Sequence, residues 1–155
     1  MIQRIQSILL LLSACVLSIS LFTPVWTASS NGTSYDLDAY QISISHETTS
    51  TSNPTYFAAI LLGISIALTL FVIFKYNNRV LQMRLNMMNT LLICMVEGLF
   101  FWNIRETKLL IGSAEFTEHF GVAFYMPLVA LMLCFYAGKR IQKDENLVRS
   151  VDRLR

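Results

Sequence analysis

The sequence predicts an all-α membrane protein: a bundle of four transmembrane helices, the last of which continues into a cytoplasmic amphipathic extension. Two observations predict this class. Of the 155 residues, 54% are hydrophobic and only 14% are charged, whereas soluble domains carry about 25% charged residues. The apolar residues also gather in four runs, each about long enough to cross a hydrocarbon core of ~30 Å as a helix. Helices are expected because lipid cannot satisfy backbone hydrogen-bonding groups.

The four runs divide the chain into one membrane domain. The second run, YFAAILLGISIALTLFVIF, has no charge, and the third is the weakest because it carries Asn89 and Glu97. Spans are predicted at residues 8–26, 56–74, 85–102 and 120–138, outer loops at 27–55 and 103–119, an inner loop at 75–84 and a tail at 139–155.

Basic residues predict the orientation. If the N-terminus lies inside, the inner segments hold ten of the twelve Lys and Arg residues, and the outer segments hold only Arg105 and Lys108. Moving basic side chains across a bilayer is disfavoured, so both termini are predicted to be cytoplasmic. A basic inner face indicates anionic lipid headgroups, rather than nucleic acid, as its charged partner.

The first span contains Leu12-Ser13-Ala14-Cys15, the order of a bacterial lipobox, in which the cysteine becomes lipidated. A signal peptide needs an apolar stretch of roughly 7–15 residues before the cut. Only residues 8–12 precede it here, and residues 16–26 continue the apolar run. We therefore favour a buried membrane cysteine over a lipid anchor. No pair of cysteines has the spacing of a metal or redox motif, and neither a metal nor another cofactor is expected.

The first outer loop has two parts. Its middle, SYDLDAYQISIS, alternates apolar and polar residues on a period of two, which predicts a short strand or hairpin at the membrane surface. Its end, SHETTSTSNPT, is rich in Ser and Thr and is interpreted as a mobile linker.

Polar residues in the third span are the candidate intramembrane site. Asn86, Asn89 and Glu97 are spaced to form one stripe facing the interior. The depth of Glu97 matches that of Tyr125 in the fourth span, and we expect a hydrogen bond between them. A carboxyl group inside a span is a functional candidate by default. One interpretation is a proton- or cation-binding group in a transport path; the favoured one is a packing residue near the interface.

Ala59, Gly63 and Ala67 recur every four residues in the second span. Small residues at this spacing let another helix approach closely. The approaching helix belongs either to this chain, which we favour, or to another subunit.

The tail, KRIQKDENLVRSVDRLR, is compatible with a helix and carries an apolar face at spacings of three and four residues. Glu145 is placed to pair with Arg149. Enzyme signatures such as a nucleophile elbow, His-Glu-x-x-His or a phosphate-binding glycine loop are missing from the sequence, and no catalytic residue is assigned. The chain is therefore predicted not to be an enzyme.

Both ends of the chain resemble a known family. MIQRIQS leads directly into an apolar helix, KDENLVRSVDRLR closes the chain, and GVAFYMPLVAL in the fourth span has a Gly–aromatic–Pro pattern. These segments resemble an uncharacterised membrane family of the Bacteroidetes group, the domain-of-unknown-function 4293 family. The resemblance implies a four-helix protein of the bacterial inner membrane, and it brings no activity or cofactor. It also implies that five residues belong to the family's tail motif: Asp144, Glu145, Arg149, Asp152 and Arg153.

Mixed charges in the tail lead to a hypothesis about function. A helix that only bound anionic lipid would need basic residues, at roughly 1 kcal/mol each, and not interleaved acids. Mixed signs suit docking onto a protein, where charge order sets the register; pairing within the helix is the alternative. The leading hypothesis is a non-enzymatic accessory or scaffold subunit of a membrane complex, with a protein partner. The alternative is a small transporter or ligand-binding protein that uses Glu97, and a lipid-modifying enzyme comes third.

Overall fold

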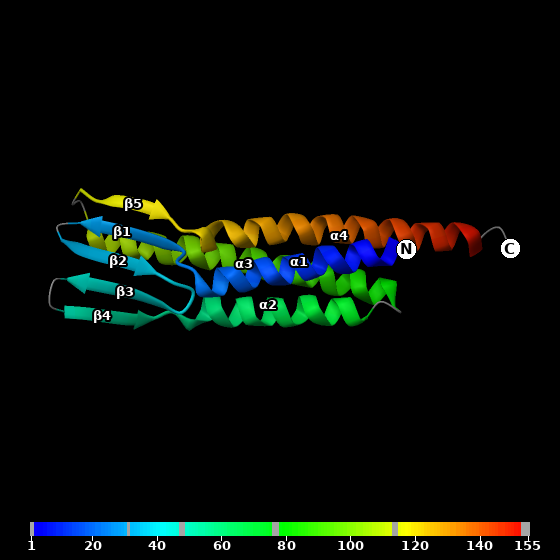
Figure 1. The fold of residues 1–155 in the computed structure, drawn as a ribbon, viewed down its shortest axis with the longest axis horizontal. Helices are drawn as coiled ribbons and strands as arrows, with labels where there is room; N and C mark the ends of the chain where they lie inside the picture. Colours follow the sequence, from blue (N-terminus) through cyan, green and yellow to red (C-terminus); the bar gives the residue numbers. More distant parts are fainter. Residues whose placement is uncertain (1, 31, 47–48, 76–77, 113–114, 153–155) are drawn as a thin grey trace.

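The computed structural model describes residues 2–30, 32–46, 49–75, 78–112 and 115–152, with the side chains of 2–4, 49 and 148–152 left out. Within these ranges the chain forms four long helices and five strands (Figure 1). In chain order they are α1 (Ile2–Phe22), β1 (Trp26–Ser30), β2 (Thr33–Leu37), β3 (Gln41–His46), β4 (Thr49–Pro54), α2 (Tyr56–Phe74), α3 (Arg79–Ile111), β5 (Thr117–Phe120) and α4 (Val122–Asp152).

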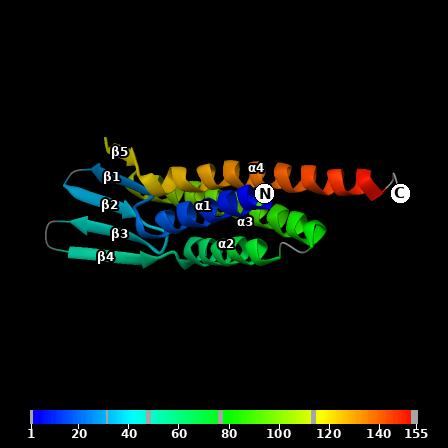
Figure 2. The same ribbon diagram turned by 45° about the vertical axis from the view of Figure 1, so that its right-hand side comes forward.

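The four helices lie side by side along the long axis of the molecule. α1 packs against α2 and α4, and α3 packs against the same two helices. The start of α1 and the end of α4 both lie away from the sheet, and α4 reaches furthest in that direction (Figures 1 and 2). We call this the basic end, because Lys and Arg side chains gather there.

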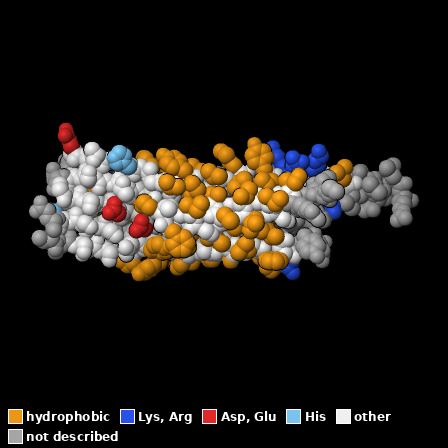
Figure 3. All heavy atoms as spheres, viewed as in Figure 1, with side chains coloured by type: hydrophobic (Ala, Val, Ile, Leu, Met, Phe, Trp, Pro, Cys, Tyr) orange, Lys and Arg blue, Asp and Glu red, His pale blue; other side chains and the backbone are white. Residues whose placement is uncertain are grey.

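All four helices are long and apolar enough to cross a membrane. Their exposed apolar side chains form a band around the middle of the molecule, between acidic residues over the sheet and basic residues at the other end (Figure 3). Such a band is the surface expected of helices that face lipid.

The prediction of an all-α fold is wrong, because the two segments predicted as outer loops form a sheet. Its five strands are all antiparallel, in the order β4-β3-β2-β1-β5. The hairpin expected from the alternating stretch is present as β2 and β3, with Tyr35 opposite Ile44 and Leu37 opposite Ile42. The segment interpreted as a mobile linker contains β4, and the second outer segment supplies β5, which pairs with β1.

The sheet is held by its own apolar face and by the long helix α3. At 33 residues, α3 is about 50 Å long at 1.5 Å per residue, so it extends beyond a hydrocarbon core of ~30 Å. Its last turns run behind the sheet (Figure 1). Trp26, Leu37 and Ile42 share one sheet face by their register, and they lie in the same buried cluster as Ile104 of α3. Burying this face needs a helix longer than one membrane span, which explains why α3 continues beyond the predicted interval of residues 85–102.

The observed helix bounds differ unevenly from the predicted spans. α2 covers 56–74, the predicted interval, whereas α1 begins six residues earlier than predicted and ends before β1. α4 continues without a break through Pro127 into the tail. Cys15 and Cys94 are exposed on the helix surface and only Cys134 is buried, so the expectation of a buried Cys15 is wrong.

A close backbone contact joins the sheet to the helices. The N–H of Gly121 donates to the carbonyl of Val25, at 2.9 Å between N and O. A Cβ atom added at Gly121 would lie 2.0 Å from the carbonyl oxygen of Pro24. Only glycine therefore fits where the segment before α4 crosses the segment after α1.

Candidate functional site

A buried polar cluster connects all four helices near the middle of the molecule. Asn89 of α3 accepts a hydrogen bond from Ser65 (2.7 Å) and donates one to Thr69 (2.8 Å), both on α2. Its amide nitrogen also lies 3.8 Å from the sulfur of Cys134 on α4, and that sulfur lies 3.2 Å from the hydroxyl oxygen of Ser13 on α1. Each helix contributes a side chain, so the cluster fixes the rotation of each helix relative to its neighbours.

Asn86, one turn from Asn89, binds the backbone of α4. Its amide nitrogen donates to the carbonyl of Cys134 at 2.9 Å, and the residue is 5% exposed. Its Oδ1 atom is buried and has no hydrogen-bond partner among the described residues. The sequence therefore identified two interior polar residues whose partners lie on other helices.

Asn86 also lines a groove between α3 and α4. The groove has a volume of about 410 Å³. Its lining residues are Met83, Asn86, Met87, Thr90, Leu91, Cys134, Phe135, Gly138, Lys139 and Gln142.

Glu97 lies apart from this cluster. It is 7% exposed, and neither carboxylate oxygen has a hydrogen-bond partner among the described side chains and backbone. The expected Glu97–Tyr125 hydrogen bond is therefore wrong. Tyr125 is 50% exposed and faces outward from α4. Glu97, Asn86 and Asn89 are all buried, yet they do not form one site.

The stripe of small residues on α2 faces outward. Gly63 and Ala67 are exposed, Ala59 is half-buried, and a Cβ atom at Gly63 would meet nothing within 4 Å. The expected packing of this stripe against a helix of the same chain is therefore wrong. α2 instead turns another face inward, which includes Leu62, Ser65 and Thr69.

The tail is held to the helices by Asp144. This residue is 8% exposed, and its carboxylate accepts a hydrogen bond from the side-chain amide of Gln6 on α1. Arg79 at the start of α3 donates to the backbone carbonyl of Asp144 at 3.1 Å. Asp144 therefore faces inward and fixes the direction of α4, while Glu145 is half-buried. The side chains of Arg149 and Asp152, and the whole of Arg153, lie outside the described residues.

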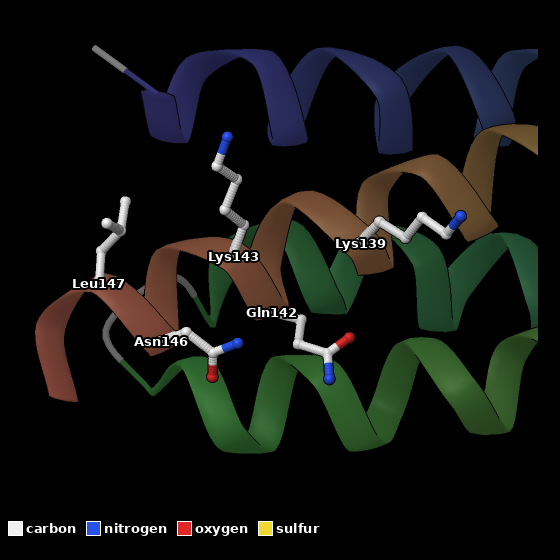
Figure 4. A pocket seen from close by; sticks show the side chains of 5 residues that line it. All are labelled: Lys139, Gln142, Lys143, Asn146 and Leu147. Carbon is white, nitrogen blue, oxygen red and sulfur yellow. The ribbon is translucent and has the colours of Figure 1, made fainter. Parts of the chain in front are cut away.

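Beyond Asp144's contacts, α4 presents an open hollow of about 540 Å³ at the basic end. Figure 4 shows its lining side chains, with Lys143 on the side of α1, and Gln142 and Asn146 on the side of α3. All five lining residues belong to α4 and are exposed: Lys139, Gln142, Lys143, Asn146 and Leu147.

A second polar group lies where α3 meets the sheet. The Lys108 ammonium is 2.6 Å from a carboxylate oxygen of Glu118 on β5, and the Trp26 indole N–H donates to the same oxygen at 2.8 Å. Lys108 also lies 5.9 Å from the ring centres of Trp26, Phe116 and Phe120. The hydrogen bond from Lys108 lowers the pKa of the Glu118 carboxyl, and the indole N–H acts in the same direction.

This group was not predicted from the sequence, because Lys108 and Glu118 fall in a segment of mixed charge that was interpreted as a loop. Their pairing depends on β5 adding to β1, a contact between residues about ninety positions apart. One sign was available: Glu118 and Phe120 alternate with Thr117 and His119 on a period of two. Among the residues with described positions, no group of three His, Cys, Asp or Glu side chains is placed to hold a metal ion.

Comparison with known proteins identifies the family. The model of the family described as a domain of unknown function, DUF4293, matches residues 2–154. The match covers nearly the whole chain, and the chain belongs to this family. No curated protein matches the chain.

Proposed function

We propose that this member of the DUF4293 family is a non-enzymatic accessory or scaffold subunit of a membrane complex, docking to its partner through the tail of α4. The observation that carries the proposal is the fixed direction of that tail. Asp144 is bound from α1 by Gln6 and from α3 by Arg79, so the exposed side chains around it project from a held helix. A surface that is already ordered loses less entropy when it binds.

The exposed face of the tail supports the same function. The hollow on α4 combines two lysine residues, two amide side chains and Leu147. An apolar side chain surrounded by polar ones is the usual arrangement of a protein interface with a polar rim. The inward position of Asp144 changes the hypothesis drawn from the sequence: this acid positions the tail, and the partner contacts the opposite face.

We further propose that the protein spans the bacterial inner membrane with both termini in the cytoplasm. The separation of charge along the molecule supports this orientation, because basic residues gather at the end that holds α1's start and α4's tail (Figure 3). Cytoplasmic segments carry an excess of Lys and Arg. The same end would contact anionic headgroups, and nucleic acid is not proposed as a partner.

The test is purification of the tagged protein from native membranes in mild detergent, with quantification of the proteins that co-purify. A chain ending at Glu145 keeps Asp144 and removes Asn146 and Leu147 from the hollow. The proposal expects one stoichiometric partner with the full chain and its loss on truncation.

A matched pair of charge reversals sharpens the test. Lys143→Glu changes the hollow, whereas Arg84→Glu changes an exposed basic residue of α3 at the same end. We expect the first to release the partner and the second to retain it. Equal retention by the truncated chain, or the absence of any stoichiometric partner, would contradict the scaffold function.

A second candidate function rests on Glu97. A carboxyl group without a partner in an apolar interior costs several kcal/mol, and such groups mark ion or proton pathways in membrane proteins. The burial of Glu97 and its two unpartnered oxygens support a transport or ligand-binding role.

Proton flux separates the two candidates. Protein in liposomes containing a pH-sensitive dye is subjected to a potassium diffusion potential. A carrier or channel acidifies the lumen faster than protein-free liposomes do, and Glu97→Gln abolishes the difference. Flux equal to that of protein-free liposomes would exclude a proton-conducting role for Glu97.

A further inference from the structure

The groove between α3 and α4 has walls suited to an alkyl chain. Met83, Met87 and Leu91 line it on α3, and Phe135 lines it on α4. Methionine side chains are flexible and polarizable, so they adapt to ligands of irregular shape. The volume of about 410 Å³ is within the range of pockets that hold small ligands.

One buried acceptor among the residues that line the groove has no hydrogen-bond donor. Asn86 is 95% buried, and its amide nitrogen is already bound to the Cys134 carbonyl, which fixes the orientation of the amide. Its Oδ1 atom has no partner within the described part of the chain, and a buried polar atom without a partner is costly. A ligand that donates an O–H to Asn86 would remove this cost.

Gly138 lets α4 approach Asn86 closely. A Cβ atom at this position would lie 3.0 Å from the Asn86 amide nitrogen, so the absence of a side chain allows the amide to pack directly against α4. Asn86 lines the groove at this level, and its Oδ1 atom is buried. A ligand hydroxyl reaches that atom by displacing a flexible side chain of the groove wall, such as a methionine.

A cation lies partway along the groove, beside Phe135. Lys139 lines the groove, and its ammonium lies 4.4 Å from the ring centre of Phe135. Arg140 and Lys143 follow on the same helix. A ligand with its alkyl chain along Met87 and Leu91 would therefore place its polar head beside this positive charge.

We propose that this groove is a binding site for an anionic phospholipid with a hydroxyl-bearing headgroup, of the phosphatidylglycerol type. One acyl chain lies along Met87 and Leu91, the phosphate lies beside Lys139, and a headgroup hydroxyl donates to Asn86 Oδ1. The proposal does not require the docking function of the tail, and the groove shares Lys139 and Gln142 with the hollow.

The experiment measures retained lipid by native mass spectrometry of the full-length protein. The delipidated protein is returned to mixed micelles containing one of three lipids. Phosphatidylglycerol has the charge and the hydroxyls, phosphatidylmethanol has the charge alone, and phosphatidylcholine is zwitterionic. We expect one bound phosphatidylglycerol per chain, weaker retention of phosphatidylmethanol, and the weakest retention of phosphatidylcholine.

Two pairs of variants locate the site. Lys139→Gln should weaken phosphatidylglycerol retention about fivefold, since one lysine near an anionic headgroup contributes about 1 kcal/mol; the exposed neighbour Arg140 gives the control, Arg140→Gln. Met87→Trp fills the groove and should abolish retention, whereas Met88→Trp changes an equally exposed methionine outside it. Circular dichroism checks that each variant folds. If Met87→Trp does not fold, the pair Lys139→Gln and Arg140→Gln provides the test.

Three outcomes would overturn the proposal. Equal retention of all three lipids would mean that only bulk lipid surrounds the groove. Equal effects of Lys139→Gln and Arg140→Gln would place the lipid elsewhere on the basic end. Equal retention of phosphatidylglycerol and phosphatidylmethanol would show that no headgroup hydroxyl binds Asn86.

Discussion

The sheet end and the basic end of the molecule have opposite interiors. Towards the sheet the buried side chains are large and apolar, as with Trp26, Leu37 and Phe100. Towards the basic end, buried positions include Gln6, Gln82, Asn86 and Asp144, joined by hydrogen bonds between helices. Along the same four helices, the interior therefore changes from one stabilised by the burial of apolar area to one arranged by directional hydrogen bonds.

The two ends are therefore expected to contribute differently: one to the stability of the fold and the other to the position of the α4 tail. Apolar burial is non-directional and scales with the area removed from water, so the sheet end is expected to contribute most of the stability gained outside the membrane. Interhelical hydrogen bonds in membranes contribute modestly, about 0.6–2 kcal/mol each, but each requires one arrangement of its partners. The polar interior at the basic end is therefore expected to fix the direction of the α4 tail more than to hold the fold together.

The largest effect is expected from Trp26→Ala at the sheet end. Trp26 is fully buried, and removal of such a side chain costs about 4 kcal/mol. The matched variant Trp102→Ala removes a tryptophan that is 59% exposed and should change stability far less. Equilibrium unfolding in mixed micelles, followed by circular dichroism, measures both. Similar losses would contradict the buried sheet interface.

Gly121→Ala comes next. Its new Cβ atom would meet backbone atoms of Pro24, which cannot move aside as a flexible side chain can. We expect a loss of about 3 kcal/mol, at the upper end for overpacking. At Gly98 an added Cβ atom meets nothing within 4 Å, so Gly98→Ala should be neutral or slightly stabilising. Unfolding under the same conditions tests the pair, and a tolerated Gly121→Ala would show that the crossing of the two segments is loose.

Asp144→Ala tests the basic end. It leaves the buried Gln6 amide without its acceptor, which costs about 2 kcal/mol. Lys143→Ala removes an exposed neighbour on the same helix and should stay within about 0.5 kcal/mol. Limited proteolysis of the tail adds a second measurement, because only Asp144→Ala should expose it to cleavage. An unchanged cleavage rate would mean that Asp144 does not hold the tail.

The smallest effect is expected from Glu118→Gln. The Lys108–Glu118 pair is about one-third exposed, and pairs of this kind contribute up to about 1 kcal/mol. Because the pKa of Glu118 is lowered in the folded protein, the contribution is complete above the ordinary carboxyl pKa of 4.5. It is lost as the pH falls through the lowered pKa.

Unfolding measured at pH 7 and at pH 3 checks this prediction. The difference between wild type and Glu118→Gln should shrink at the lower pH. Glu115→Gln, on an exposed acid before β5, should match the wild type at both values. A Glu118→Gln difference that grows on acidification would contradict the assigned pair.

The sequence predicted the helices that could span a membrane better than it predicted the sheet end of the molecule. The bounds of α2 were predictable because an uncharged apolar run of this length satisfies its backbone hydrogen bonds in lipid only as a helix. β4 was not, because TSTSNP lacks apolar residues and becomes a strand only by pairing with β3. The extension of α3 was not predicted, because the charges of NIRETK were interpreted as the start of a loop. These charges also suit a helix that continues past an apolar span and packs against a sheet.

The candidate site was predicted in part. Spacing along α3 identified Asn86, Asn89 and Glu97 as inward-facing, since residues on one helix share a face at fixed intervals. Their partners on other helices were not predictable, because depth in the membrane does not give the rotation of a neighbouring helix. Tyr125 shows this limit: it was expected at the depth of Glu97, but its side chain faces outward.

Hydrogen–deuterium exchange in lipid nanodiscs tests most directly the claim that the two ends are organised independently. The comparison needs wild type, Gly121→Ala and Asp144→Ala. We predict protected sheet amides in the wild type, faster exchange confined to β1 and β5 in Gly121→Ala, and faster exchange confined to the start of α1 and the tail of α4 in Asp144→Ala. Unprotected sheet amides in the wild type, or loosening of both ends by either variant, would contradict the claim.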